Sequence, residues 1–182
     1  MIKKIIFLLG FLYLSGCALP SVEPFHPIDF KDEKPIVFPV GQIRTEDQTT
    51  RYTELPHLET RIPVTPAYAL KTALENRFTG VSENNDTLDF VIKTADLTQK
   101  DQPSDHWYIL NNIEYLLTYQ VDIVYTRNST KQQVQHLSGW EKQAIPKRSS
   151  LRDKEAAWQK MINAMIQKTT DKILADAPFT PQ

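Results

Sequence analysis

The amino-acid sequence predicts an α+β fold: a two-layer sandwich in which two amphipathic helices pack on one face of a mostly antiparallel four-stranded sheet. Three segments, and more weakly a fourth, place apolar residues at every second position, as strands with one buried and one solvated face do. Two other segments place apolar residues at three- and four-residue steps, as helices with one buried stripe do. The apolar face of such a sheet can bury both stripes. The expected element order is β-α-β-β-β-α.

The first strand is expected at residues 36–45, because apolar side chains alternate there at Ile36, Phe38 and Val40. Pro39 lies within this segment and cannot donate a backbone hydrogen bond, which favours an edge position or a bulge. The stretch 46–64 that follows is polar and irregular, and it connects this strand to the first helix.

The first helix is expected at residues 66–79. Thr65 suits the N-cap and Pro66 suits the first helical position. Gly80 stands where a C-terminal cap is expected. The apolar residues of the segment share one helical face, namely Ala67, Leu70, Leu74 and Phe78.

Three further strands are expected to pair as a meander. The second lies near residues 87–97, where the alternating residues are Leu88, Phe90 and Ile92. The third has the clearest pattern, with six alternate positions at Tyr115, Leu117, Tyr119, Val121, Ile123 and Tyr125. A turn at residues 127–130 leads to a weaker fourth strand, whose expected stripe is Val134, His136, Ser138 and Trp140.

The second helix is expected to begin at Ser150, three residues before Asp153, and to end before Pro178. Its apolar stripe is Trp158, Met161, Ile162, Met165, Ile166, Thr169 and Ile173. We interpret Trp158, the methionines of this helix and the tyrosines of the third strand as core residues.

The N-terminal segment indicates export and a lipid anchor. Lys3 and Lys4 precede an apolar run at residues 5–14, which as a helix spans only about 15 Å, half of a bilayer core. This pattern is typical of a signal peptide, here residues 1–16. The sequence Leu14-Ser15-Gly16-Cys17 resembles the lipobox of bacterial lipoproteins, which implies that Cys17 is acylated and becomes the new N-terminus. Ala18 stands where an aspartate would signal inner-membrane retention, so the resemblance implies the outer membrane and its periplasmic face.

Residues 17–35 form a Pro-rich segment between this anchor and a single domain at residues 36–178. Its prolines are Pro20, Pro24, Pro27 and Pro35. Such composition favours an extended, semi-rigid tether. The alternative is an ordered arm that packs onto the domain through its apolar residues, Phe25, Ile28 and Phe30.

Composition excludes several classes of function. The 182 residues carry 21 basic and 22 acidic side chains, and a nucleic-acid-binding protein would show a basic excess. The lipobox resemblance implies that the single cysteine is used by the lipid, which would leave no thiol nucleophile or thiolate metal site. The four histidines are scattered and the five glycines form no phosphate-binding loop. We therefore expect no cofactor, no metal and no enzymatic activity. The alternative is a hydrolase that uses Asp105 and His106.

Two segments are candidates for a partner surface. One is the proline-bounded stretch from Tyr52 to Pro66, which contains His57 and Glu59 and is too long for a simple connection. The other is the aromatic segment 106–110, which includes His106 and Trp107. Exposed aromatic side chains are typical of interfaces, whereas the alternative for this second segment is that it begins the third strand in the core.

The segment 43–70 resembles a family of uncharacterised proteobacterial lipoproteins. The similarity lies in Tyr52, Pro56 and Glu59, then in Pro63-Val64-x-Pro66-Ala67-x-Ala69-Leu70, and in Ser150-Leu151-Arg152-Asp153-x-Glu155. The element order also resembles that of the lipopolysaccharide-assembly lipoprotein and of the auxiliary lipoproteins of ABC-type lipid transporters. Neither resemblance supplies catalytic residues.

The sequence thus predicts a membrane-anchored, non-enzymatic accessory subunit that binds another protein of the cell envelope during assembly or transport. The alternative is a carrier that holds a lipid or another apolar ligand between the helices and the sheet. That alternative predicts a cavity lined by Phe90, Tyr115, Tyr119 and Met165.

Overall fold

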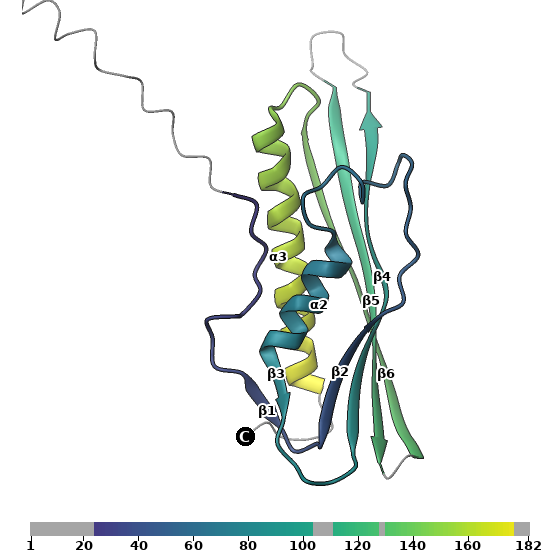
Figure 1. The fold of residues 1–182 in the computed structure, drawn as a ribbon. Helices are drawn as coiled ribbons and strands as arrows, with labels where there is room; N and C mark the ends of the chain where they lie inside the picture. Colours follow the sequence, from purple (N-terminus) through teal and green to yellow (C-terminus); the bar gives the residue numbers. More distant parts are fainter. Residues whose placement is uncertain (1–23, 104–110, 128–129, 177–182) are drawn as a thin grey trace, which may run out of the picture.

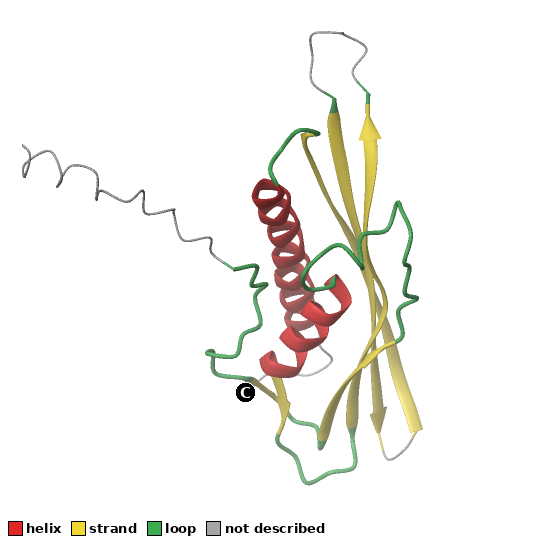
Figure 2. Ribbon diagram, turned by 45° about the horizontal axis from the view of Figure 1, so that its top comes forward, coloured by secondary structure: helices red, strands yellow, loops and turns green. Residues whose placement is uncertain are grey.

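The computed structural model describes residues 24–103, 111–127 and 130–176 (Figure 1). The order of elements is β1 (Ile36–Phe38), β2 (Gln42–Asp47), α2 (Pro66–Arg77), β3 (Phe78–Gly80), β4 (Thr87–Gln102), β5 (Asn112–Arg127), β6 (Thr130–Pro146) and α3 (Leu151–Asp176). A four-stranded sheet has the order β2-β4-β5-β6, and α2 and α3 cover one of its faces (Figure 2). This is the predicted α+β sandwich.

The three long strands form the predicted meander. β4 and β5 pair antiparallel, as do β5 and β6, whereas β2 pairs with β4 in parallel. Each long strand extends beyond its predicted bounds. The added residues are mostly polar, and the backbone ladder continues through them because it needs no apolar side chain.

The predicted first strand is wrong in one respect, because it is two strands separated at Pro39. β1 pairs in parallel with β3, and β2 pairs with β4. Gly41 lies at the division, where a Cβ atom would be 2.0 Å from the carbonyl oxygen of Asn84. Pro39 and the close approach of the backbone at Gly41 therefore divide the segment into β1 and β2, although the alternation of apolar residues in the sequence is continuous.

The first helix has the predicted start but a different end. The Thr65 hydroxyl accepts a hydrogen bond from the Tyr68 backbone N–H, and Pro66 is the first helical residue. The helix ends at Arg77 and passes directly into β3, so Gly80 is not its C-terminal cap. Gly80 instead makes room for the neighbouring chain, since a Cβ atom there would lie 2.6 Å from the carbonyl oxygen of Val40.

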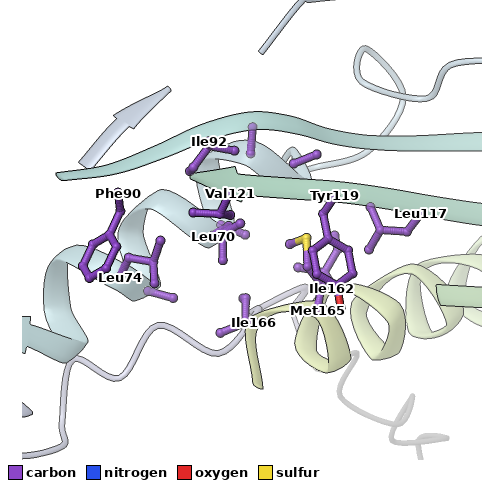
Figure 3. Close-up of a cluster of buried hydrophobic side chains, with 14 of the residues drawn as sticks. Leu70, Leu74, Phe90, Ile92, Leu117, Tyr119, Val121, Ile162, Met165 and Ile166 are labelled. Atoms are coloured by element: carbon purple, nitrogen blue, oxygen red, sulfur yellow. The ribbon is translucent and has the colours of Figure 1, made fainter. Parts of the chain in front are cut away.

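The core lies between the helices and the sheet. Leu74 of α2 lies beside Phe90 and Leu70 lies beside Val121, while Met165 of α3 packs near Tyr119 (Figure 3). Tyr115, Tyr119 and the apolar residues of the α3 stripe belong to this core as predicted, and the half-buried Tyr125 packs against it. The Tyr115 and Trp158 rings meet edge to face with centroids 5.7 Å apart. Neither α2 nor α3, the helices of the described residues, has the length and apolarity needed to cross a bilayer.

The stripe predicted for the fourth strand lies on the wrong face. The register pairs Gly139 with the core residue Tyr119, and it pairs Trp140 with Thr118 on the outer face, the face turned away from the helices. Trp140 is 63% exposed, whereas Leu137 is 2% exposed and packs in the core. β6 lies at the edge of the sheet, and its outer face is open to solvent. Burial therefore does not impose a strict alternation of apolar and polar residues on this strand.

The chain before β1 packs along α3. The His26 backbone N–H donates to Oε1 of Gln159 at 3.3 Å, and that of Ile28 donates to Oδ1 of Asn163 at 2.9 Å. Phe30 is buried, and Phe25 and Ile28 pack against the core. Residues 24–30 of the Pro-rich segment thus form an arm that packs on the domain, which is the second of the two alternatives.

Candidate functional site

The loop between β2 and α2 is fastened to the edge of β4. The Leu58 backbone N–H donates to the carbonyl of Leu97 at 2.9 Å, and that of Gln99 donates to the carbonyl of Pro56 at 2.8 Å. His57 opposes Thr98 in this short antiparallel pairing. Leu58 is 1% exposed and enters the core. One end of a long polar loop is thereby held in a defined position beside the sheet.

Three residues predicted for a partner surface meet in this loop. Nδ1 of His57 lies 2.7 Å from Oδ2 of Asp96, and the Tyr52 ring stacks on the imidazole with centroids 3.9 Å apart. The Tyr52 backbone N–H donates to Oε2 of Glu59 at 2.8 Å. These contacts orient the Tyr52 ring and hold its backbone, so their effect is to shape the loop.

A groove of about 960 Å³ opens between this loop, β2 and the exposed face of α2. Its volume is within the range of protein ligand sites, roughly 300–1,000 Å³. β2 contributes Thr45, Glu46 and Asp47. The loop contributes Thr49, Arg51, Tyr52, Thr53, Glu59, Thr60, Pro63, Val64 and Thr65, and α2 contributes Ala67, Tyr68, Lys71, Thr72 and Glu75.

The groove carries an excess of negative charge. Its acidic residues are Glu46, Asp47, Glu59 and Glu75, and its basic residues are Arg51 and Lys71. The Lys71 ammonium lies 3.8 Å from Glu75, one helical turn away. Asp47 accepts hydrogen bonds from the backbone N–H and the hydroxyl of Thr49, at 2.9 and 2.7 Å. The surface therefore suits a ligand with positive charge.

The imidazole of His57 already has a partner. Among the described residues, the only hydrogen bond of the His57 ring is to Asp96, and no group of three or more histidine, cysteine, aspartate and glutamate side chains could hold a metal ion. His57 is engaged by Asp96 of β4, whereas Glu59 accepts a hydrogen bond from the Tyr52 backbone N–H of the loop.

The α2 wall is what the sequence analysis missed. Tyr68, Lys71, Thr72 and Glu75 follow one another at helical spacing on the polar side of α2. The available signal was the non-apolar face of the predicted helix, which by itself resembles any solvated surface. Only the return of the loop onto β4 places this face opposite Tyr52.

The remaining predicted site residues lie outside the described part of the chain. These are Cys17, His106 and Trp107, together with Asp105 of the hydrolase alternative. The carrier alternative concerned residues that are described: Phe90, Tyr115 and Met165 are fully buried in the core, and Tyr119 lines a groove of about 460 Å³ between β6 and α3. All four belong to the core cluster between the helices and the sheet.

A second histidine–carboxylate pair lies on the outer face of the sheet. Nδ1 of His136 is 2.7 Å from Oδ1 of Asp122, across the β5–β6 pairing. Burial raises the pKa of Asp122, but hydrogen bonds from His136 and Gln120 outweigh it and hold this pKa below its ordinary value. The pair joins two neighbouring strands, and the sequence analysis did not identify it.

No protein-family model matches the sequence, and no curated protein matches it. Among solved structures, the chain is similar to a minor lipoprotein from Acinetobacter baumannii, with 14% identity and a TM-score of 0.42 over 76% of this chain and 97% of that one. It is similar to the rare lipoprotein B from Shewanella oneidensis, with 15% identity and a TM-score of 0.36 over 72% and 94% of the two chains. It is also similar to an uncharacterised lipoprotein B from Nitrosomonas europaea, with 13% identity and a TM-score of 0.39 over 75% and 84%. All three are bacterial lipoproteins.

Proposed function

We propose that this chain is a lipid-anchored envelope lipoprotein whose domain binds another envelope protein and catalyses no reaction. The observation that carries the binding role is the groove between β2, α2 and the loop that follows β2. Its walls present two exposed tyrosines, Tyr52 and Tyr68, beside charged side chains. Tyrosine supplies large contact area with a polar tip, the combination that protein interfaces favour.

The proposed anchor is Cys17. The apolar run 5–14 is too short to span a bilayer, and the resemblance of residues 14–17 to a lipobox supports acylation of the cysteine. Several acyl chains contribute about 0.8 kcal/mol for each buried CH₂ and hold a protein stably. Ala18 after the cysteine supports a location at the outer membrane, with the domain on the periplasmic face of that membrane.

The absence of catalysis is part of the proposal. The acidic side chains Asp47 and Glu59 accept hydrogen bonds from loop groups, and the ring of His57 is engaged by Asp96 and Tyr52. These contacts support a structural use of side chains that would otherwise be candidates for proton transfer.

The anchor is tested by growing cells with radiolabelled palmitate. The mature chain should incorporate the label and stay with membranes in high salt, and Cys17→Ser should abolish both. An unlabelled wild-type chain that washes off membranes would contradict the proposed anchor.

The binding role is tested by chemical cross-linking in cells, followed by affinity isolation from solubilised envelopes. Tyr68 and Trp140 are aromatic residues with equal exposure of 63%, and only Tyr68 lines the groove. The wild type and Trp140→Ser should both recover the same envelope protein, and Tyr68→Ser should lose it. Repeated recovery of the lipoprotein alone, or loss of the protein with Trp140→Ser instead, would contradict the proposed surface.

A further inference from the structure

We propose that the groove binds an extended, basic segment of a partner protein, which adds a strand to the free edge of β2 and is held against it by α2. This inference rests on the proposed function, because it names the class of partner and its mode of binding. Adding a strand to an exposed sheet edge is a general mode of peptide recognition, in which backbone hydrogen bonds supply affinity and side-chain contacts supply specificity.

β2 has a free edge because it is the terminal strand of the sheet. The Gln42 backbone N–H donates to the carbonyl of Asp86 at 3.3 Å, and that of Gln48 donates to the carbonyl of Ile92 at 2.9 Å. Backbone groups alternate in direction along a strand, so the even-numbered residues of β2 face β4. Ile43, Thr45 and Asp47 therefore direct their N–H and C=O groups away from the sheet.

These outward backbone groups are available to a ligand. Within the described residues, none of the three positions makes a backbone hydrogen bond on that side. Thr45 and Asp47 line the groove. The hydroxyl oxygen of Thr45 is also buried without a hydrogen-bond partner in the described chain.

α2 provides the opposite wall. Tyr68, Lys71, Thr72 and Glu75 occur at spacings of three, one and three residues, which places them on one helical face toward the groove. α2 lies beside β2 in both ribbon views (Figures 1 and 2). A strand laid along β2 would direct alternate side chains toward this face. The exposed Tyr68 ring is a contact for their aliphatic parts.

The charge of the groove selects the ligand. Four carboxylates face two cationic side chains, so lysine or arginine side chains complement the lining and acidic segments are repelled. The acidic excess excludes a nucleic-acid backbone on the same grounds. The stretch from Ile43 to Asp47 matches about five residues of an extended segment, or roughly 17 Å.

The direct test is fluorescence anisotropy with the full chain in detergent and three labelled heptapeptides. The first alternates lysine and valine, the second alternates glutamate and valine, and the third is the lysine peptide with alternate backbone nitrogens methylated. The lysine peptide should bind saturably, and the other two should bind at least about tenfold more weakly, because one lacks charge complementarity and the other lacks ladder donors. Equal binding of the three peptides, or no binding of the lysine peptide, would overturn the proposal.

Thr45→Pro tests the edge itself. The Thr45 N–H points away from β4, so proline removes the donor to the ligand and leaves the β2–β4 pairing in place, and we expect at least about tenfold weaker binding. The matched variant Thr45→Val keeps the backbone N–H and should bind within about threefold of wild type. Equal losses with both variants, or none with Thr45→Pro, would overturn the backbone mode.

Amide hydrogen exchange locates the peptide independently of any variant. Bound lysine peptide should slow exchange at Ile43, Thr45 and Asp47. Slowing confined to β6, the other edge of the sheet, or peptide-independent slowing that follows the formation of dimers of this chain, would overturn the proposal. The outcome is separable from the anchor, because peptide binding needs no acylation and palmitate labelling needs no peptide.

Discussion

Leu58 determines whether the loop that walls the groove keeps its position. Its side chain is 1% exposed and belongs to the core cluster, while its backbone N–H pairs with Leu97. Leu58→Ala removes three buried carbon atoms, worth about 2.4 kcal/mol at roughly 0.8 kcal/mol each. The cavity that remains adds to this, so we expect a loss of about 3–4 kcal/mol in the free energy of unfolding.

Urea unfolding followed by circular dichroism measures this loss, and Leu55→Ala is the matched control. Leu55 is in the same loop but is 52% exposed, so the same change should alter stability by less than about 0.5 kcal/mol. Equal effects of the two variants would refute the assignment of Leu58 as the anchor.

The loop should also respond locally to Leu58→Ala. The Gln99 backbone N–H donates to the carbonyl of Pro56, so the amide of Gln99 reports on the fastening of the loop to β4. Its hydrogen exchange should accelerate more than that of amides in the centre of β5, because a weakened loop opens without unfolding the whole domain. Uniform acceleration across the sheet would show that Leu58 stabilises the core and does not act on the loop in particular.

Three other features of the fold give separate predictions. Gly139→Ala should cost about 1–3 kcal/mol of stability in urea unfolding, because its Cβ would lie 2.3 Å from the Tyr119 hydroxyl; in a Tyr119→Leu background the cost should fall below about 0.5 kcal/mol. Because the folded pKa of Asp122 is lowered, its stabilising contribution is present above the ordinary value of 3.8 and is lost as the pH falls through the folded value; urea unfolding at about pH 6 and about pH 2 should show a smaller acid loss for Asp122→Asn than for wild type. Thr65→Ala removes the N-cap acceptor of α2 and should lower stability by about 1 kcal/mol, with Thr65→Ser close to wild type.

The sequence patterns that predicted the fold are those where burial on one face dictates residue type. Burial alternates strictly from Tyr115 to Ile123 because every second side chain of β5 meets the helices. β6 is an edge strand with solvent on its outer face, so Trp140 and His136 could stand there without penalty and the apparent stripe pointed the wrong way. In a central strand with one fully buried face, the periodicity of apolar residues shows which side chains face the core. In a strand at the edge of the sheet, it does not.

The role of Gly80 and the surroundings of the loop could not be predicted, because both depend on contacts between residues that are distant in sequence. Gly80 resembled a helix cap because it follows an apolar helical stripe, yet its position is required by the Val40 carbonyl, which lies far away in sequence. The loop was identified as a surface from its length and its prolines, and Tyr52, His57 and Glu59 do meet there. Asp96, the partner of His57, and the facing wall of α2 come from other elements, and local sequence carries no information about which elements become neighbours.

The two edges of the sheet differ in a way that assigns strand addition to β2. β6 spans seventeen residues, and two of its neighbouring side chains form ion pairs to other elements, Glu141 with Lys168 of α3 and Lys142 with Glu114 of β5. Of the residues that line the groove, three belong to β2 and none belongs to β6.

β2 protects its edge by other means. It has only six residues, and α2 and the loop flank the outward side of Thr45 and Asp47, so a segment must enter a walled groove to reach the backbone. A short, recessed edge resists unspecific pairing while leaving a defined set of hydrogen-bonding groups to a complementary ligand. The same walls that limit aggregation therefore provide the side-chain contacts that select a basic segment.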